Sequence, residues 1–129
     1  MSFLADACAL IVFHGFGGQT MSPAAKSAMA SGDVSVSPIT VWEITRKVAL
    51  GKLKQPTPPG FNGGFAEWLR HAGYRTVALG WDECERANTL PMHHKDPMDR
   101  MLIATALNRS MTVISDDTIF AEYGVTTLW

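Results

Sequence analysis

This chain of 129 residues has two cysteines, a net charge close to zero and no long apolar run. The two cysteines, Cys8 and Cys84, show no zinc-ligand spacing with each other or with the pair His93–His94. The formal net charge of -1 argues against a protein that coats DNA non-specifically, because such proteins present a strongly basic face. A chain of this length can bury a core without disulfides or zinc, so we expect one domain over residues 1–129.

The sequence also shows no pattern typical of a transmembrane helix or of a signal peptide. The longest apolar run, Ala7 to Phe13, is too short to cross a bilayer. Residues 1–13 are apolar, but they include Asp6 and lack the basic start of a signal peptide. Two thiols in an otherwise ordinary chain favour a reducing compartment. We therefore expect a soluble, cytoplasmic protein with no membrane partner.

Strand-like and helix-like segments alternate along the chain. A serine or aspartate followed by proline marks three helix starts, at Ser22, Ser37 and Asp96. The alternation predicts an α/β three-layer sandwich, with a mostly parallel sheet of about four or five strands and helices on both faces. Strands are predicted at 2–5, 34–37, 75–79, 111–114 and 125–128, and helices at 7–13, 22–31, 38–50, 65–72, 82–90 and 97–108.

The stretch from His94 to Leu107 contains the most unusual of these helix starts. Asp96 is placed to cap the helix, and Pro97 suits its first position. Asp99 then lies in the first turn, near the positive end of the helix dipole. It could be the acidic residue of a capping box, or a carboxylate held rigidly for metal binding or acid–base chemistry.

Acidic residues follow the predicted strands at the end where parallel strands meet. Asp6 comes directly after the first strand, and Asp116 and Asp117 come directly after the fourth. Glu43 lies in the helix after the second strand, and Asp99 in the first turn of a later helix. Because parallel strands present their carboxyl ends at one edge, we expect all these acids to gather there.

Each acid also has an ordinary structural explanation. Asp6 can cap a helix, Glu43 can pair with Lys47, and one of the two late aspartates can shape a turn. Carboxylates that do gather raise one another's pKa values, and a cation relieves that repulsion. Hard oxygen ligands select Mg²⁺ or Mn²⁺, ions that serve phosphodiester hydrolysis.

Four blocks of the chain together resemble a PIN-domain protein, most closely the VapC-like toxins of type II toxin–antitoxin pairs. They occur in the family's order and extend from end to end of the chain. The resemblance implies a metal-dependent endoribonuclease that leaves a 5′-phosphate and a 3′-hydroxyl. The blocks are Leu4–Leu10, Ser37–Ile44, His94–Ala104 and Val113–Phe120.

The resemblance also implies a set of site residues. Asp6, Glu43, Asp99 and Asp117 match the family's four acids in order, and they would hold Mg²⁺ or Mn²⁺ and carry catalysis. Asp116 occupies a variable position and is interpreted as a bystander. The residues considered for contacts around these acids or with substrate are Ser115, Asp96, Thr40, Arg100 and His94; for Asp96 a capping role, and for His94 and Arg100 a structural role, remain open.

The implied partners are an RNA substrate, a cognate antitoxin and a second copy of the chain. An antitoxin arginine could satisfy several carboxylates at once. The densest basic cluster could bind phosphates or could be a solvated helix end. Three aromatic residues could form partner surfaces or pack in the core. The basic residues are Arg46, Lys47, Lys52 and Lys54, and the aromatic residues are Trp42, Phe65 and Trp68.

Two other function classes also place acids at strand ends. A receiver-type or phosphatase-type domain needs an early aspartate pair and a lysine after a late strand. Only Asp6 stands early, and no lysine follows Lys95, which argues against this class. The alternative that stays open is a catalytically silent domain whose acidic pocket binds a basic peptide.

Overall fold

The computed structural model describes residues 2–129 and shows a three-layer α/β/α sandwich. Over these residues five parallel strands form one sheet in the order β3-β2-β1-β4-β5. The predicted fold class is therefore confirmed. The strands are β1 (Phe3–Ala5), β2 (Val34–Val36), β3 (Arg75–Thr76), β4 (Thr112–Ile114) and β5 (Thr127–Leu128).

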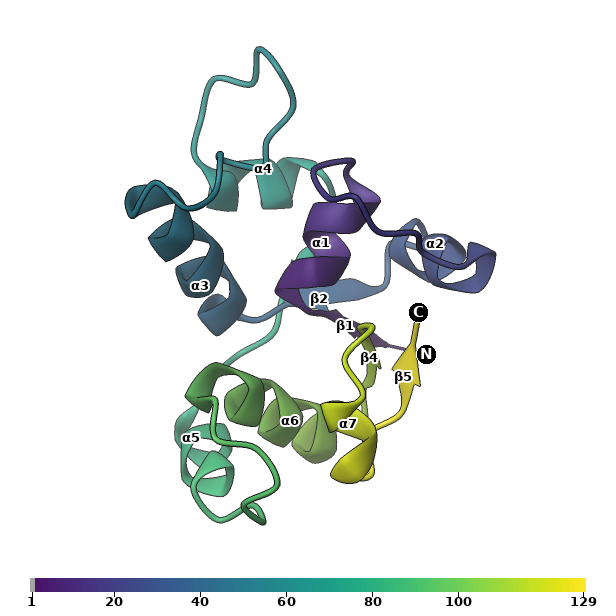
Figure 1. Ribbon diagram of the computed structural model, residues 1–129, viewed down its shortest axis with the longest axis vertical. Helices are drawn as coiled ribbons and strands as arrows, with labels where there is room; N and C mark the ends of the chain where they lie inside the picture. Colours follow the sequence, from purple (N-terminus) through teal and green to yellow (C-terminus); the bar gives the residue numbers. More distant parts are fainter. Residues whose placement is uncertain (1) are drawn as a thin grey trace.

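Helices cover both faces of this sheet. Figure 1 shows α1 to α4 on one side and α5 to α7 on the other. None of the helices within residues 2–129 has the length and apolar character needed to span a bilayer. The helices are α1 (Ala7–Phe13), α2 (Pro23–Met29), α3 (Pro38–Ala49), α4 (Phe65–His71), α5 (Trp81–Ala87), α6 (Pro97–Arg109) and α7 (Ile119–Glu122).

Two hydrophobic cores form because successive strand residues point to opposite faces of the sheet. Leu4 packs into one core with Ile103 of α6 and Phe120 of α7. Its neighbour Ala5 packs into the other core, which contains Ile44 of α3 and residues of α1, α2 and α4. The helix that carries Asp99 is thereby fixed to one face, and the helix that carries Glu43 to the other.

Local capping chemistry starts the helices as predicted at three places. The Ser22 hydroxyl accepts from the amide of Ala25, the Ser37 hydroxyl from that of Ile39, and the Asp96 carboxylate from that of Met98. In each helix the next residue is proline, whose missing amide hydrogen costs nothing at that position.

The sequence also predicts Asp82 as the cap of the helix at 82–90, Thr45 as a core-facing residue and a short turn at Phe120, and these local predictions are wrong. Asp82 does not cap α5, which begins at Trp81 because the Glu83 carboxylate accepts from the Gly80 amide at 3.0 Å. Thr45 does not face the core; it is exposed, and its hydroxyl donates to the Val41 carbonyl. The segment around residue 120 is a short helix rather than only a turn.

The chain adds β2 and β3 on one side of β1 and then β4 and β5 on the other, so the sheet has a topological switch point between β1 and β4. β1 has β2 on one side and β4 on the other. Asp6 follows β1 directly, and the segment Ser115–Asp117 follows β4. In parallel sheets ligands bind in the crevice outside the carboxyl ends of two such strands. The fold therefore brings the first and last predicted acids to its switch point.

The buried face of α6 is expected to carry a large share of the stability. Ile103 is fully buried, so Ile103→Ala should lower the free energy of unfolding by about 2–5 kcal/mol through lost contacts and a residual cavity. Urea denaturation followed by circular dichroism measures this change. Leu50→Ala is the control, because Leu50 is 54% exposed and its loss should have little effect. Equal effects of the two changes would contradict this packing.

Candidate functional site

Asp6 is the most deeply placed of the predicted acids. Its carboxylate accepts from the amide of Ala9 at 2.8 Å and thus caps α1. Burial raises the pKa of Asp6 to about 6, although hydrogen bonds from the Ser115 hydroxyl and the Ala9 amide oppose the shift. The charges of Asp116 and Asp99 raise the pKa further. Asp6 is therefore both a cap and a member of an acidic cluster.

Asp99 is half-buried at the N-terminal end of α6 and faces a histidine. Its Oδ2 lies 2.7 Å from Nε2 of His94. Burial raises the pKa of Asp99, the His94 contact lowers it, and the charges of Asp96 and Asp117 raise it. Among the described residues its carboxylate makes no hydrogen bond to the Asp96 amide, so the capping-box explanation does not apply.

Glu43 reaches the same cluster from α3. Its carboxylate pairs with Lys47 at 3.7 Å, as the ordinary explanation predicted. Burial nevertheless raises the pKa of Glu43; Lys47 lowers it, and the charges of Asp99 and Asp96 add to the increase. The pKa of Glu43 therefore depends on the charges of Asp96 and Asp99, at the start of α6, as well as on that of Lys47.

The two aspartates after β4 differ in their contacts. Asp117 accepts from the amide of Ile119, the first residue of α7, at 3.0 Å, and its charge raises the pKa of Asp99. Asp116 is exposed, and its charge raises the pKa of both Asp6 and Cys8. Asp116, interpreted from the sequence as a bystander, thus contributes to the same negative potential.

The contacts of Arg100 are those of a residue that stabilises the fold. Its side chain is buried, and its guanidinium donates to the carbonyls of Leu90, Pro91 and His94 at 3.0–3.1 Å. The Tyr123 hydroxyl reinforces this arrangement by donating to the Pro91 carbonyl and accepting from the His94 amide. Arg100 therefore holds the loop that places His94 beside Asp99, and its donors point to backbone rather than to solvent.

One group of candidate ligand atoms lies together at the start of α6 in the described part of the chain, and of the predicted set Asp6, Glu43, Asp99 and Asp117 it contains only Asp99. One ligand atom each from His94, Asp96 and Asp99 lies within 4.8 Å of the other two. The Thr40 hydroxyl, one turn before Glu43 on α3, is buried and has no hydrogen-bond partner among residues 2–129. The raised pKa values of Asp6, Glu43 and Asp99 fit a Mg²⁺ or Mn²⁺ ion with its waters, because a cation would stabilise their charged forms.

The aromatic residues divide between core and surface. Phe65 and Trp68 are only 3% and 6% exposed and pack in the core of the α1–α4 face, so of the two explanations core packing applies to them and a partner surface does not. Their burial follows from α4 lying against the sheet, which its sequence alone does not reveal. Trp42 is 51% exposed and remains on the surface of α3.

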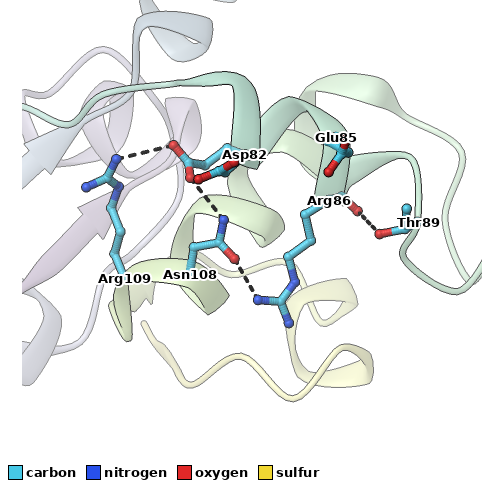
Figure 2. Close-up of a pocket in the computed structure, with 7 residues that line it drawn as sticks. Asp82, Glu85, Arg86, Thr89, Asn108 and Arg109 are labelled. Carbon is cyan, nitrogen blue, oxygen red and sulfur yellow. Dashed lines mark hydrogen bonds and ion pairs between the residues drawn. The ribbon is translucent and has the colours of Figure 1, made fainter.

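A large open depression lies away from these acids. It measures about 600 Å³ and occupies the junction between α5 and the C-terminal end of α6 (Figure 2). Its polar groups bind one another: the buried Glu83 carboxylate accepts from Asn108 at 2.9 Å and from Arg109 at 3.2 Å, and these bonds help to lower its pKa. This network fastens α5 to α6 and is structural.

Comparison with known families identifies the fold that holds these acids. The family model of the PIN domain matches residues 3–125. The chain belongs to the PIN domain family. PIN domains are nucleases, and the acids at the β1–β4 edge are therefore the part of this PIN domain to consider for hydrolysis. No curated protein matches the chain significantly.

Solved structures of similar shape support the PIN fold. One is FitAcB from Neisseria gonorrhoeae, with 19% identity, a TM-score of 0.61, and 98% of this chain and 96% of that chain covered. VapBC2 from Rickettsia felis, bound to a fragment of promoter DNA, has 9% identity, a TM-score of 0.64 and coverages of 98% and 97%. VapBC-1 from nontypeable Haemophilus influenzae has 14% identity, a TM-score of 0.59 and coverages of 98% and 96%.

The raised pKa of Asp6 predicts a pH-dependent stability cost in this PIN domain. Folding favours the protonated carboxyl, so without metal the wild type should lose stability as pH rises through the interval from 3.8 to about 6. Asp6→Asn keeps a good cap and removes the charge. Above that interval in EDTA, the variant should be more stable than wild type by about 1–3 kcal/mol.

Urea denaturation of both proteins at pH 3.5 and pH 7.5 would test this. The advantage of Asp6→Asn should nearly vanish at the lower pH, where both forms carry no charge at this position. An advantage of the same size at both pH values would show that ionisation of Asp6 is not its cause.

Proposed function

We propose that this PIN domain is a metal-dependent endoribonuclease and the VapC-like toxin of a type II toxin–antitoxin pair. The support for the proposal is the mutual effect of charges among four acids from separate parts of the chain, together with the placement of Asp6 and Asp117 after the paired strands β1 and β4. The charge of Asp99 raises the pKa values of Asp6 and Glu43. The charge of Asp117 in turn raises the pKa of Asp99.

The metal would be Mg²⁺ or Mn²⁺. Asp6, Glu43 and Asp99 would hold it, with Asp117 binding directly or through water. When bound, such an ion orients the phosphate, activates water and stabilises charge on the leaving oxygen. The raised pKa values of the three inner acids support this assignment, because a cation would stabilise the carboxylates that burial and repulsion disfavour.

The chain's own groups would position the reacting atoms. The Ser115 hydroxyl orients the Asp6 carboxylate, and the loop held by Arg100 places His94 against Asp99. Either Glu43 or a hydroxide held by the metal would take the proton from the attacking water. Together these contacts would fix the carboxylates before substrate arrives.

A protein partner would regulate this site. The similar solved chains come from assemblies named FitAB and VapBC, one bound to IR36 DNA and another to promoter DNA. We infer that this chain likewise pairs with a cognate antitoxin and forms a homodimer. A basic antitoxin side chain could satisfy several carboxylates of the cluster, exclude metal and suppress cleavage.

Neutralising one acid should abolish activity without unfolding the protein. Asp99→Asn and Asp6→Asn are each expected to reduce Mg²⁺- or Mn²⁺-dependent cleavage of RNA by more than ~100-fold, because each removes a charge that holds the cation. Gel analysis of a labelled RNA measures the rate, and circular dichroism checks the fold. Asp82→Asn, an exposed acid on α5, is the matched control and should keep wild-type activity.

Wild-type rates in either site variant would refute the assignment of these residues. Wild-type protein that cleaves no RNA with either metal would instead favour the silent interaction domain, in which the same acids bind a basic peptide. Cleavage that persists in EDTA would exclude the metal dependence.

A further inference from the structure

The cluster at the start of α6 contains a nitrogen donor as well as carboxylates. Nε2 of His94 lies 2.7 Å from Oδ2 of Asp99. Asp96 brings a second carboxylate, and one ligand atom from each of the three residues lies within 4.8 Å of the other two. The metal ligands predicted from the sequence are all oxygen donors, so the imidazole of His94 adds a different ligand chemistry.

A simple hydrogen-bonded pair of His94 and Asp99 does not explain the whole cluster. Asp96 caps α6 through its Oδ1, which accepts from the amide of Met98, and its charge also raises the pKa of Asp99. One imidazole offsets one negative charge at most, and only when it carries a proton. Two carboxylates beside one imidazole therefore leave negative charge that a dication would offset.

The cluster is partly shielded from solvent and still open to a small ion. The side chains of His94 and Asp99 are 31% and 25% exposed, and Asp96 is also half-buried. Partial burial strengthens the attraction between a cation and these carboxylates, because less water screens the charges. Partial exposure leaves the entry path that a metal site needs.

The backbone of His94 is fixed at both its amide and its carbonyl. The amide donates to the Tyr123 hydroxyl at 3.0 Å, and the carbonyl accepts from the Arg100 guanidinium at 3.0 Å. Arg100 and Tyr123 also share the carbonyl of Pro91 as an acceptor. A ligand on a backbone held in this way loses little conformational freedom when an ion binds, which favours binding.

We propose that His94 is a nitrogen ligand of the cation that Asp99 binds, with Asp96 as an adjacent carboxylate, so that the site takes a first-row transition-metal dication in preference to Mg²⁺. The inference rests on the proposed function, in which Asp99 holds the metal, and it narrows the two ions named there to Mn²⁺. Imidazole nitrogen is a common ligand of first-row transition metals, whereas Mg²⁺ takes oxygen ligands and keeps several of its waters.

Pulsed electron paramagnetic resonance of the tag-free protein loaded with Mn²⁺ tests this ligand directly. A coordinated imidazole nitrogen couples magnetically to Mn²⁺, so the wild type should show a nitrogen modulation of the echo. His94→Gln should abolish that modulation, because a glutamine amide can still donate to Asp99 but has no ring nitrogen to bind the metal. His93→Gln is the matched control: His93 is the exposed neighbour, and its loss should leave the modulation unchanged.

Calorimetric titration separates metal ligation from a positioning role. His94→Gln should weaken Mn²⁺ binding by about 10-fold or more and weaken Mg²⁺ binding much less, because only the transition metal uses the nitrogen. An equal loss of affinity for the two ions would show that His94 only positions Asp99, and would refute the proposal. Circular dichroism checks that each variant keeps the fold.

The outcomes distinguish this inference from the nuclease assignment. Saturable Mn²⁺ binding without nitrogen modulation, in a wild type that cleaves RNA, would refute the His94 ligand and leave the nuclease intact. Nitrogen modulation that depends on His94, in a wild type that cleaves no RNA, would support the ligand and refute the nuclease. A wild type that binds no Mn²⁺ would refute both the ligand and the proposed metal dependence.

Discussion

Burial of several carboxylates near the carboxyl ends of β1 and β4, with repulsion among them, is the constraint on which the rest of this structure depends. Asp6, Glu43 and Asp99 come from three different elements, and the pKa of each is raised by burial first and by neighbouring acids second. Such a cluster costs stability unless hydrogen bonds or cations offset it. The Ser115 hydroxyl, the Ala9 amide, His94 and Lys47 provide part of that compensation, and a divalent cation would complete it.

The helix α6 has different roles at its two ends. At its start, Asp96 caps the helix and Arg100 ties down the loop that carries His94. At its end, Asn108 and Arg109 bind the buried Glu83 and fasten α5 in place. Between them, residues such as Ile103 anchor the helix to the sheet. Rigid attachment along the whole helix keeps Asp99 in place despite the repulsion it experiences.

Local chemistry explains which features the sequence could predict. The caps at Ser22, Ser37 and Asp96 depend on neighbouring residues alone, and all three were found. The placement of Asp6 and Ser115–Asp117 after two neighbouring strands followed from the alternation of strands and helices, since parallel strands end at one edge. Competing local signals misled the prediction at α5, where Asp82 looked like a cap but the Glu83 carboxylate binds the Gly80 amide.

Long-range contacts explain what sequence alone could not provide. His94 reaches Asp99 only because Arg100 gathers three carbonyls of a preceding loop, and no spacing rule encodes that closure. The proximity of Asp116 to Asp6 arises from the pairing of β1 with β4. In the same way, the contrast between a buried Trp68 and an exposed Trp42 depends on how their helices lie on the sheet.

The most direct test of the central claim is calorimetric titration of the whole protein with Mn²⁺ at pH 6, in two buffers of different ionisation enthalpy. If the acids form a cation site, binding should be saturable and lost in Asp6→Asn. It should also release protons, because near this pH the Asp6 carboxyl is only partly ionised before metal arrives. Absence of saturable binding, or binding that Asp6→Asn leaves unchanged, would contradict the account.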